Sequence, residues 1–298
     1  MLAIVGCQPT AQDISPTRLL DASQISGARA FEDVRQLVAI TPRHSGTEGA
    51  ERAAKHLQGA LTPFTDNCRI DSFEDETPVG PLTFRNVIGM QTGRGSDIII
   101  LASHYDTKAG IADDFQGAND SGSSSGLLIE LARVLRGQPP LPFQGMFALF
   151  DGEECIKAYG EEDGLHGSRQ LVRQLRERNA LSNVKAMILL DMVGDKDLTI
   201  TLPRNVDRKL MSMAFRAARE AGIRKKFTLS KNTILDDHVP FVEAGVPAIN
   251  LIDFQHGSRH GLNDYWHTEN DTLEHIRADS LQSVGEVVIH MLNALATE

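Results

Sequence analysis

The sequence has few cysteines, no long apolar run and no excess of basic charge. Its 298 residues include three cysteines without CxxC spacing, so no disulfide framework is indicated. No apolar run approaches the roughly 18 residues that span a bilayer. The net charge of −10, without a basic block, argues against a nucleic acid partner. A chain of this length buries enough surface to fold without disulfides, and its 41% hydrophobic composition is typical of a globular protein.

The N-terminus contains one cysteine in a recognisable context. Residues 2–7 (LAIVGC) resemble the end of a bacterial lipoprotein signal, in which the cysteine receives lipid. No basic segment precedes them and the apolar stretch is short, so an ordinary apolar N-terminus is the alternative. The lipoprotein interpretation predicts a truncated signal and tether over residues 1–25 with a lipid anchor at Cys7. It also predicts a single domain over residues 26–298 and an extracytoplasmic location, in the periplasm or at the outer membrane.

Strand and helix patterns alternate along the rest of the chain. Short apolar runs predict buried strands at 97–102, 147–150, 186–190 and 247–252. Apolar residues at helical spacing predict helices near 31–40 and 49–61, at 125–135 and at 281–295. The alternation predicts an α/β fold of three layers, in which a central, mostly parallel mixed sheet is flanked by helices. Ligands of such sheets bind beyond the carboxyl ends of the strands.

Polar residues follow these predicted strands, as a site at the carboxyl ends requires. His104 comes shortly after the first strand, Glu153 and Glu154 follow the second, and Asp191 follows the third. Further candidates elsewhere in the chain are Asp120, Asp236, Trp266 and His267. Singly, each has an ordinary structural role, such as a helix cap or a core aromatic. Together, converging carboxylates would repel and lose solvation, and a divalent cation resolves that conflict.

The residue types narrow the choice of cation and chemistry. Imidazole mixed with carboxylate suits zinc, which keeps an open coordination position when it is catalytic. In the adjacent pair Glu153-Glu154, one carboxylate can bind metal while its neighbour serves as general acid and base. The sequence therefore predicts a zinc enzyme.

Six short motifs occur in the order in which one enzyme family carries them. They are 104–108 (HYDTK), 117–121 (GANDS), 151–154 (DGEE), 190–191 (LD), 236–241 (DDHVPF) and 266–268 (WHT). They resemble the zinc aminopeptidase family that also contains the animal-type glutaminyl cyclases. The resemblance runs from about residue 30 to the C-terminus and implies a zinc exopeptidase-like catalytic domain.

Two activities are found on this scaffold, and the first is aminopeptidase activity. The aminopeptidases hold two zinc ions and hydrolyse the N-terminal peptide bond of a peptide. The implied ligand sets are His104, Asp120 and Asp191 for one zinc, and Asp120, Glu154 and His267 for the other. Asp120 then bridges the two ions and Glu153 is the general base.

The second activity is cyclisation of an N-terminal glutamine of a peptide or protein to pyroglutamate, with release of ammonia. The cyclases resemble the aminopeptidases but use one zinc, with Asp120, Glu154 and His267 as the implied ligands. Glu153 is implied to carry the proton from the α-amine to the leaving group. Asp191 and Asp236 are implied to form a carboxylate network beside it, and Trp266 to wall the pocket.

Several features favour the cyclase interpretation. Trp266 directly precedes His267, Asp236 stands where the aminopeptidases often carry a serine, and the insertion 155–163 is of the kind that cyclases carry. The chain also departs from the animal cyclases. Asn250 stands where the animal cyclases often carry a histidine. The disulfide that braces the animal site is absent, and Ser103 and Ser125 lie near its positions. We therefore expect a glutaminyl-peptide cyclotransferase, with a two-zinc aminopeptidase as the alternative.

A non-catalytic peptide-binding module is a further alternative. Glu153 argues against it, because a module that had lost its chemistry would be expected to lose the proton shuttle first. The acidic run 161–163 is predicted to be a solvated loop, and His256 and His260 are predicted to lie at the rim of the pocket. Cys155 is assigned to packing.

Overall fold

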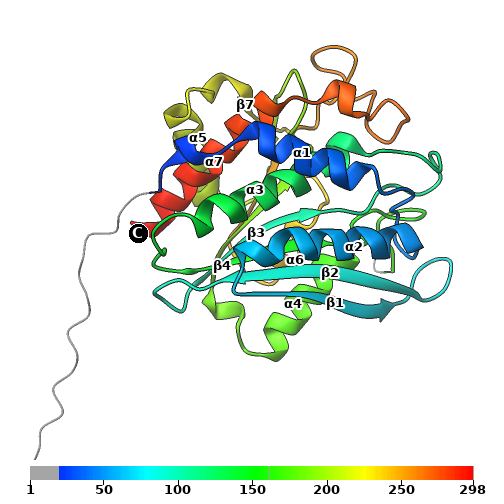
Figure 1. The fold of residues 1–298 in the computed structure, drawn as a ribbon, viewed down its shortest axis with the longest axis horizontal. Helices are drawn as coiled ribbons and strands as arrows, with labels where there is room; N and C mark the ends of the chain where they lie inside the picture. Colours follow the sequence, from blue (N-terminus) through cyan, green and yellow to red (C-terminus); the bar gives the residue numbers. More distant parts are fainter. Residues whose placement is uncertain (1–19, 161, 298) are drawn as a thin grey trace, which may run out of the picture.

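The protein is described by a computed structural model over residues 20–160 and 162–297 (Figure 1). Residues 1–19 lie outside the described part, and with them Cys7 and the predicted lipid anchor. None of the helices in the described ranges is long and apolar enough to cross a membrane.

A mixed sheet forms the centre of the described structure. Its six strands there are β1 (Asn67–Asp75), β2 (Leu82–Gln91), β3 (Ile98–His104), β4 (Gln144–Phe150), β5 (Val184–Asp191) and β8 (Ala248–Ile252). They lie in the order β1-β2-β4-β3-β5-β8, and β6 (Ile200–Leu202) pairs separately with β7 (Phe227–Leu229). β4, β3, β5 and β8 are parallel, whereas β1 and β2 pair antiparallel at one edge. The predicted mostly parallel mixed sheet is confirmed.

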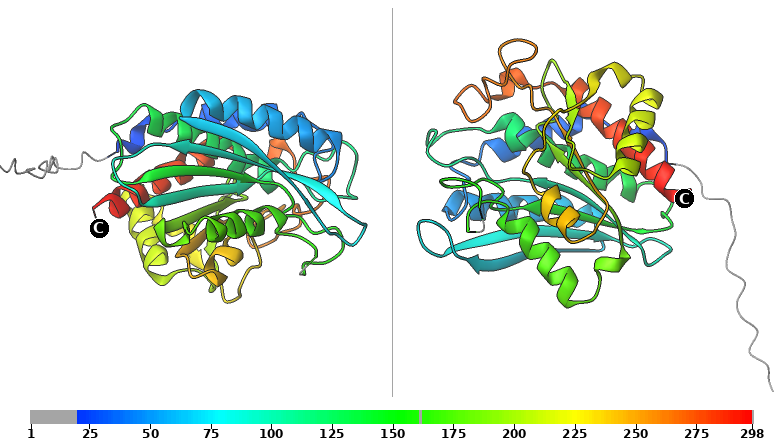
Figure 2. Two further views of the ribbon diagram at one scale, coloured as in Figure 1. Left: turned by 90° about the horizontal axis from the view of Figure 1, so that it is seen from below. Right: turned by 180° about the vertical axis from the view of Figure 1, so that it is seen from behind.

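Helices cover both faces of this sheet, which gives three layers (Figure 2). The helices associated with one face are α1 (Gly27–Val38), α2 (Glu48–Leu61), α3 (Ser124–Arg136) and α7 (Ala278–Ala296), with α5 (Arg208–Glu220) packed against α7. The helices on the other face are α4 (His166–Glu177) and α6 (His238–Glu243). Along β3, Ile99 and Leu101 face the first layer while Ile100 and Ala102 face the second. This alternation explains why β3 is apolar at every position from Ile98 to Ala102.

The predicted helices correspond to α1, α2, α3 and α7, with shifted ends. The Ser26 hydroxyl accepts the backbone N–H of Arg29, so α1 begins at Gly27. Thr47 caps α2 in the same way by accepting the N–H of Ala50. Short polar side chains in front of a helix therefore set where these two elements start.

The folded part begins earlier than the predicted boundary at residue 26. Leu20 and Ile25 are buried in the first helical layer. The backbone N–H of Leu20 donates to Asn293 Oδ1 at 2.7 Å, which attaches this segment to α7. Residues 20–25 thus pack with the domain and are not a tether.

Candidate metal centre and active site

The candidate residues meet at the carboxyl ends of the parallel strands. His104 ends β3, Asp191 ends β5, and Glu153 and Glu154 follow β4, which pairs directly with β3. Asp120 lies in an irregular turn, Ala118–Ser123, that leads into α3. Strands that pair side by side bring these side chains together, as the sequence predicts.

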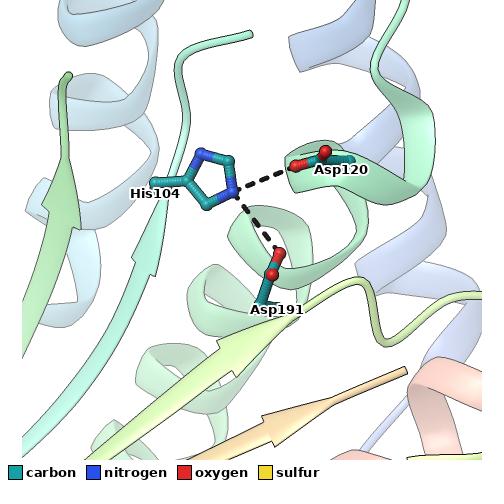
Figure 3. Close-up of side chains that lie close together, drawn as sticks. All are labelled: His104, Asp120 and Asp191. Atoms are coloured by element: carbon teal, nitrogen blue, oxygen red, sulfur yellow. Dashed lines mark ion pairs between the residues drawn. The ribbon is translucent and has the colours of Figure 1, made fainter. Parts of the chain in front are cut away.

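The described residues contain two groups of possible metal ligands, and the two groups share one carboxylate. In the first group, His104 Nε2 lies 3.1 Å from Asp120 Oδ1 and 3.4 Å from Asp191 Oδ1 (Figure 3). In the second, His267 Nε2 lies 2.8 Å from Glu154 Oε1 and 3.4 Å from Asp120 Oδ2. Asp120 belongs to both groups, so it lies between two potential metal positions.

The electrostatics of these groups fit a cation. Burial and, after it, the nearby Asp120 carboxylate raise the pKa of Glu154 to about 7, although His267 opposes this effect. Burial disfavours the charged form of His267, but Asp120 and Glu154 outweigh it and raise its pKa to about 10. Glu154 Oε2 and Asp191 Oδ1 are buried with no hydrogen bond from the described residues. Buried carboxylate oxygens of this kind, mixed with imidazole, are suitable ligands for zinc.

Asp106 fixes the backbone that carries Glu153 and Glu154. Its Oδ1 accepts the N–H of Glu153 at 3.2 Å and its Oδ2 accepts the N–H of Glu154 at 3.1 Å. One fully buried carboxylate therefore fixes the backbone of both glutamates. From this backbone, the Glu153 side chain reaches Tyr159 and the Glu154 side chain reaches His267. The sequence did not identify this role, although Asp106 lies in the HYDTK motif.

Glu153 faces a tyrosine that the sequence analysis also missed. The Tyr159 hydroxyl lies 3.1 Å from each oxygen of the Glu153 carboxylate. Burial raises the pKa of Glu153 well above its usual value, although the imidazole of His104 opposes this. Tyr159 lies in the insertion 155–163, so the insertion completes the pocket rather than merely lengthening a loop.

Asp236 is held by the asparagine that replaces the expected histidine. Asn250 Nδ2 donates to Asp236 Oδ2 at 2.6 Å, and both side chains are buried. Burial raises the pKa of Asp236 well above its usual value, and the neighbouring Asp191 and Asp237 add to this effect. An amide therefore fills the position of the histidine and still donates a hydrogen bond to the carboxylate.

These side chains surround a pocket of about 260 Å³. Its polar wall consists of His104, Asp120, Glu153, Glu154, Tyr159, Asp191, Thr233, Asp236 and His267, and its apolar wall of Ile234, Leu235, Ile252, Phe254 and Trp266. Trp266 stacks on His267 with ring centroids 4.0 Å apart, and it also meets the Phe254 ring in a T-shaped arrangement with centroids 5.1 Å apart. The indole therefore forms a wall and also supports a candidate metal ligand.

A family model described as Peptidase family M28 matches residues 86–292. The chain belongs to peptidase family M28. The M28 chain is similar in structure to a glutaminyl cyclase from an Acidobacteriales bacterium, with 34% identity, a TM-score of 0.86, and coverage of 98% of this chain and 99% of that one. It is also similar to a Zn-dependent exopeptidase from Parabacteroides distasonis, with 25% identity and a TM-score of 0.79. The match covers 90% of this chain and 98% of that one. In sequence it is 26% identical to a glutaminyl-peptide cyclotransferase of Drosophila melanogaster, over 90% of this chain and 82% of the relative.

A cluster of serines joins β3 to α3 next to the M28 site. Ser103 Oγ lies 2.8 Å from Ser124 Oγ and 3.4 Å from Ser125 Oγ. The Ser125 hydroxyl also donates to the backbone oxygen of His104 at 2.7 Å. The resemblance places the disulfide of the animal cyclases near Ser103 and Ser125, and in this M28 chain hydroxyl groups connect β3 to α3 there.

Two expectations outside the site were wrong. His256 does not lie at the pocket rim, because it is wholly buried between carboxylates and does not line the pocket, whereas His260 is exposed. In the run predicted to be a solvated loop, Glu162 is exposed but Asp163 is buried, and the Asp163 carboxylate accepts the N–H groups of Ile156, Lys157 and Ala158. His256 and Asp163 both lie in glycine-flanked loops, and their burial depends on hydrogen-bond partners that the local sequence pattern does not identify.

Proposed function

We propose that this M28 chain is a glutaminyl-peptide cyclotransferase, which converts the N-terminal glutamine of peptides or proteins to pyroglutamate and releases ammonia. The observation that carries the proposal is the pocket in which Glu153 and a candidate metal group face an indole wall. The insertion contributes Tyr159 to this pocket of about 260 Å³, which can hold a side chain the size of glutamine. The similarity to glutaminyl cyclases over most of both chains supports the same proposal.

The residues of the pocket can perform the required proton transfer. Zinc held by Asp120, Glu154 and His267 would polarise the γ-carbonyl of the substrate glutamine. Glu153 accepts a proton from the α-amine as the α-nitrogen bonds to the side-chain carbonyl carbon, Cδ, of the glutamine. It returns the proton to the amide nitrogen as the Cδ–Nε bond breaks, and this nitrogen leaves as ammonia. The raised pKa of Glu153 favours both steps, because the carboxylate binds the proton more strongly than an ordinary glutamate does before it returns the proton. The hydrogen bonds from Tyr159 keep its carboxylate oriented towards the pocket.

One zinc ion is the expected number for a cyclase. A two-zinc aminopeptidase is the second candidate, because the group of His104, Asp120 and Asp191 has ligand atoms close enough to hold another ion. The similarity to a Zn-dependent exopeptidase supports this second candidate. The reaction and the metal content therefore have to be measured together.

A paired assay on protein with a defined zinc content tests the proposal. We expect ammonia and a pyroglutamyl product from a glutaminyl dipeptide, no amine from leucyl and alanyl amides, and one tightly bound zinc per chain. Amide hydrolysis without cyclisation would instead establish an aminopeptidase and make His104 and Asp191 ligands of a second zinc.

Replacing Trp266 by alanine is expected to reduce glutamine cyclisation severely, mainly through KM. The substitution removes the pocket wall and also the ring that stacks on His267. Steady-state kinetics together with zinc analysis separate these two effects. Trp266→Phe, which keeps an aromatic wall, is the matched control and should retain more activity. An unaffected rate in the alanine variant would remove the indole from the site.

We propose further that Cys7 is lipidated and that the enzyme is located outside the cytoplasm. The support is the LAIVGC sequence at residues 2–7. Labelling cells with a fatty-acid analogue is expected to mark the natural protein. A Cys7→Ser protein that still carried the label would overturn the assignment.

A further inference from the structure

A wholly buried histidine lies behind the pocket, between two carboxylates. His256 Nδ1 lies 2.9 Å from Asp195 Oδ2, and His256 Nε2 lies 3.2 Å from Asp271 Oδ1. Each ring nitrogen therefore faces an acceptor, and both can be satisfied only if the ring is protonated. Burial disfavours the charge, but the two carboxylates outweigh it and raise the pKa of His256 to about 9. A buried cation thus joins two buried anions.

The carboxylate on one side of this histidine holds the peptide that carries Asp120. Asp271 Oδ1 accepts the N–H of Asn119 at 2.7 Å, and Asp271 Oδ2 accepts the N–H of Asp120 at 2.9 Å. Two consecutive amides are therefore fixed by one side chain. The position of the Asp120 carboxylate in both ligand groups depends on this clamp.

The same histidine is attached to the loop that carries His267, which is drawn in orange in Figure 1. The backbone oxygen of His256 accepts the backbone N–H of Tyr265 at 3.2 Å, and the backbone N–H of His256 donates to Asn263 Oδ1 at 3.1 Å. The Tyr265 ring also meets the His256 ring edge-on, with centroids 5.4 Å apart. His256 therefore contacts the supports of two ligands that are far apart in the sequence, Asp120 and His267.

A second buried cation lies close to the same turn but makes a different kind of contact. The Arg43 guanidinium donates to the backbone oxygens of Tyr105 and Gly117, at 2.9 and 2.8 Å. Arg43 therefore hydrogen-bonds to the main chain near Asp120, whereas His256 hydrogen-bonds to the Asp271 carboxylate. Among the hydrogen bonds of the described residues, His256 is the one side chain that bonds to the Asp271 carboxylate, and the same residue also contacts the His267 loop.

We propose that His256 is a positioning residue of the metal centre, which holds Asp120, through Asp271, and the loop of His267 at the spacing that one metal ion requires. The proposal rests on the proposed function in that Asp120 and His267 bind zinc. It extends that function by assigning control of zinc affinity to a residue that touches neither metal ligands nor substrate. Partners behind metal ligands commonly contribute in this way.

His256→Asn and His256→Gln form a matched pair of tests. The asparagine amide is short and can replace the contact of Nδ1 to Asp195, whereas the longer glutamine amide can replace the contact of Nε2 to Asp271. We expect zinc affinity, measured by competition with a chromophoric chelator, to fall roughly 10–100-fold in His256→Asn. His256→Gln should recover part of this loss. The absorption spectrum of the Co²⁺-loaded protein should shift in the asparagine variant, because the ligand geometry changes.

His166→Asn is the control for loss of a buried histidine that pairs with a carboxylate. Like His256, His166 is buried, and its Nδ1 lies 3.0 Å from Asp75 Oδ2. It has no hydrogen bond to Asp271 or to the peptide groups that carry Asp120. Its zinc affinity should match that of the unmodified protein. The proposal is overturned if His256→Asn binds zinc with unchanged affinity, or if His166→Asn weakens binding equally.

A variant that does not fold leaves the proposal testable. If His256→Asn does not fold, Asp271→Asn weakens the same link in a side chain of equal size, and unchanged zinc affinity there would overturn the proposal. Zinc affinity is measured without turnover. A failure of the cyclase assignment, seen in the product assay, is therefore distinguishable from a failure of this one.

Discussion

Replacing Glu153 by glutamine is expected to lower kcat for glutamine cyclisation roughly 10²–10⁴-fold. Glutamine keeps the shape of the side chain and can still hydrogen-bond to Tyr159, but it cannot accept and return a proton. The zinc content should stay the same, because the proposed ligand is the neighbouring Glu154. Steady-state kinetics and elemental analysis of the same preparation measure both quantities.

Glu154→Gln is the matched control, because it makes the same chemical change one residue along the chain. We expect this variant to lose zinc as well as activity, since Glu154 Oε1 lies in the second ligand group. Loss of zinc from the Glu153 variant would contradict the division of roles between the two glutamates.

Replacing Asp120 by alanine is expected to remove metal and activity together, whichever activity the enzyme has. Asp120 belongs to both ligand groups, with Oδ1 near His104 and Oδ2 near His267. Its loss leaves each group with two ligands, which are too few for a stable zinc site. The zinc content after dialysis should fall below detection, and added zinc should not restore turnover at concentrations that saturate the unmodified protein.

His104→Ala distinguishes one metal from two in the same experiment. His104 belongs only to the first ligand group. In a one-zinc cyclase, this variant should retain its zinc, and in a two-zinc aminopeptidase, the content should fall from two to one. An Asp120→Ala protein that kept a full zinc complement would contradict both assignments of ligands.

The sequence allowed the central part of the fold to be predicted but not its edge. β3, β4, β5 and β8 are buried on both faces, so their apolar runs are continuous and recognisable. β1 (NCRIDSFED) is half exposed at the edge of the sheet and carries charged residues at positions that face water. Its pairing with β2 depends on contacts across the sheet, which no local pattern records. The antiparallel edge was therefore missed, while the parallel centre was not.

The site shows the same contrast between local and distant information. His104, Glu154 and Asp191 could be predicted because each follows a recognisable strand, and the family motifs then indicated the other candidates. Tyr159 could not, because its contact to Glu153 depends on how a nine-residue insertion folds back over the pocket. His256 was misplaced for a similar reason, since the carboxylate partners of this histidine lie 61 and 15 residues away.

The serine cluster between β3 and α3 has a practical consequence for handling the enzyme. The connection from Ser103 to Ser124 and Ser125 consists of hydroxyl hydrogen bonds, which form as the chain folds and require no oxidant. Thiol reductants break disulfides but have no reaction with hydroxyl groups. The brace beside His104 should therefore persist in dithiothreitol or in a reducing cytosol, which permits production in ordinary bacterial hosts without an oxidative refolding step.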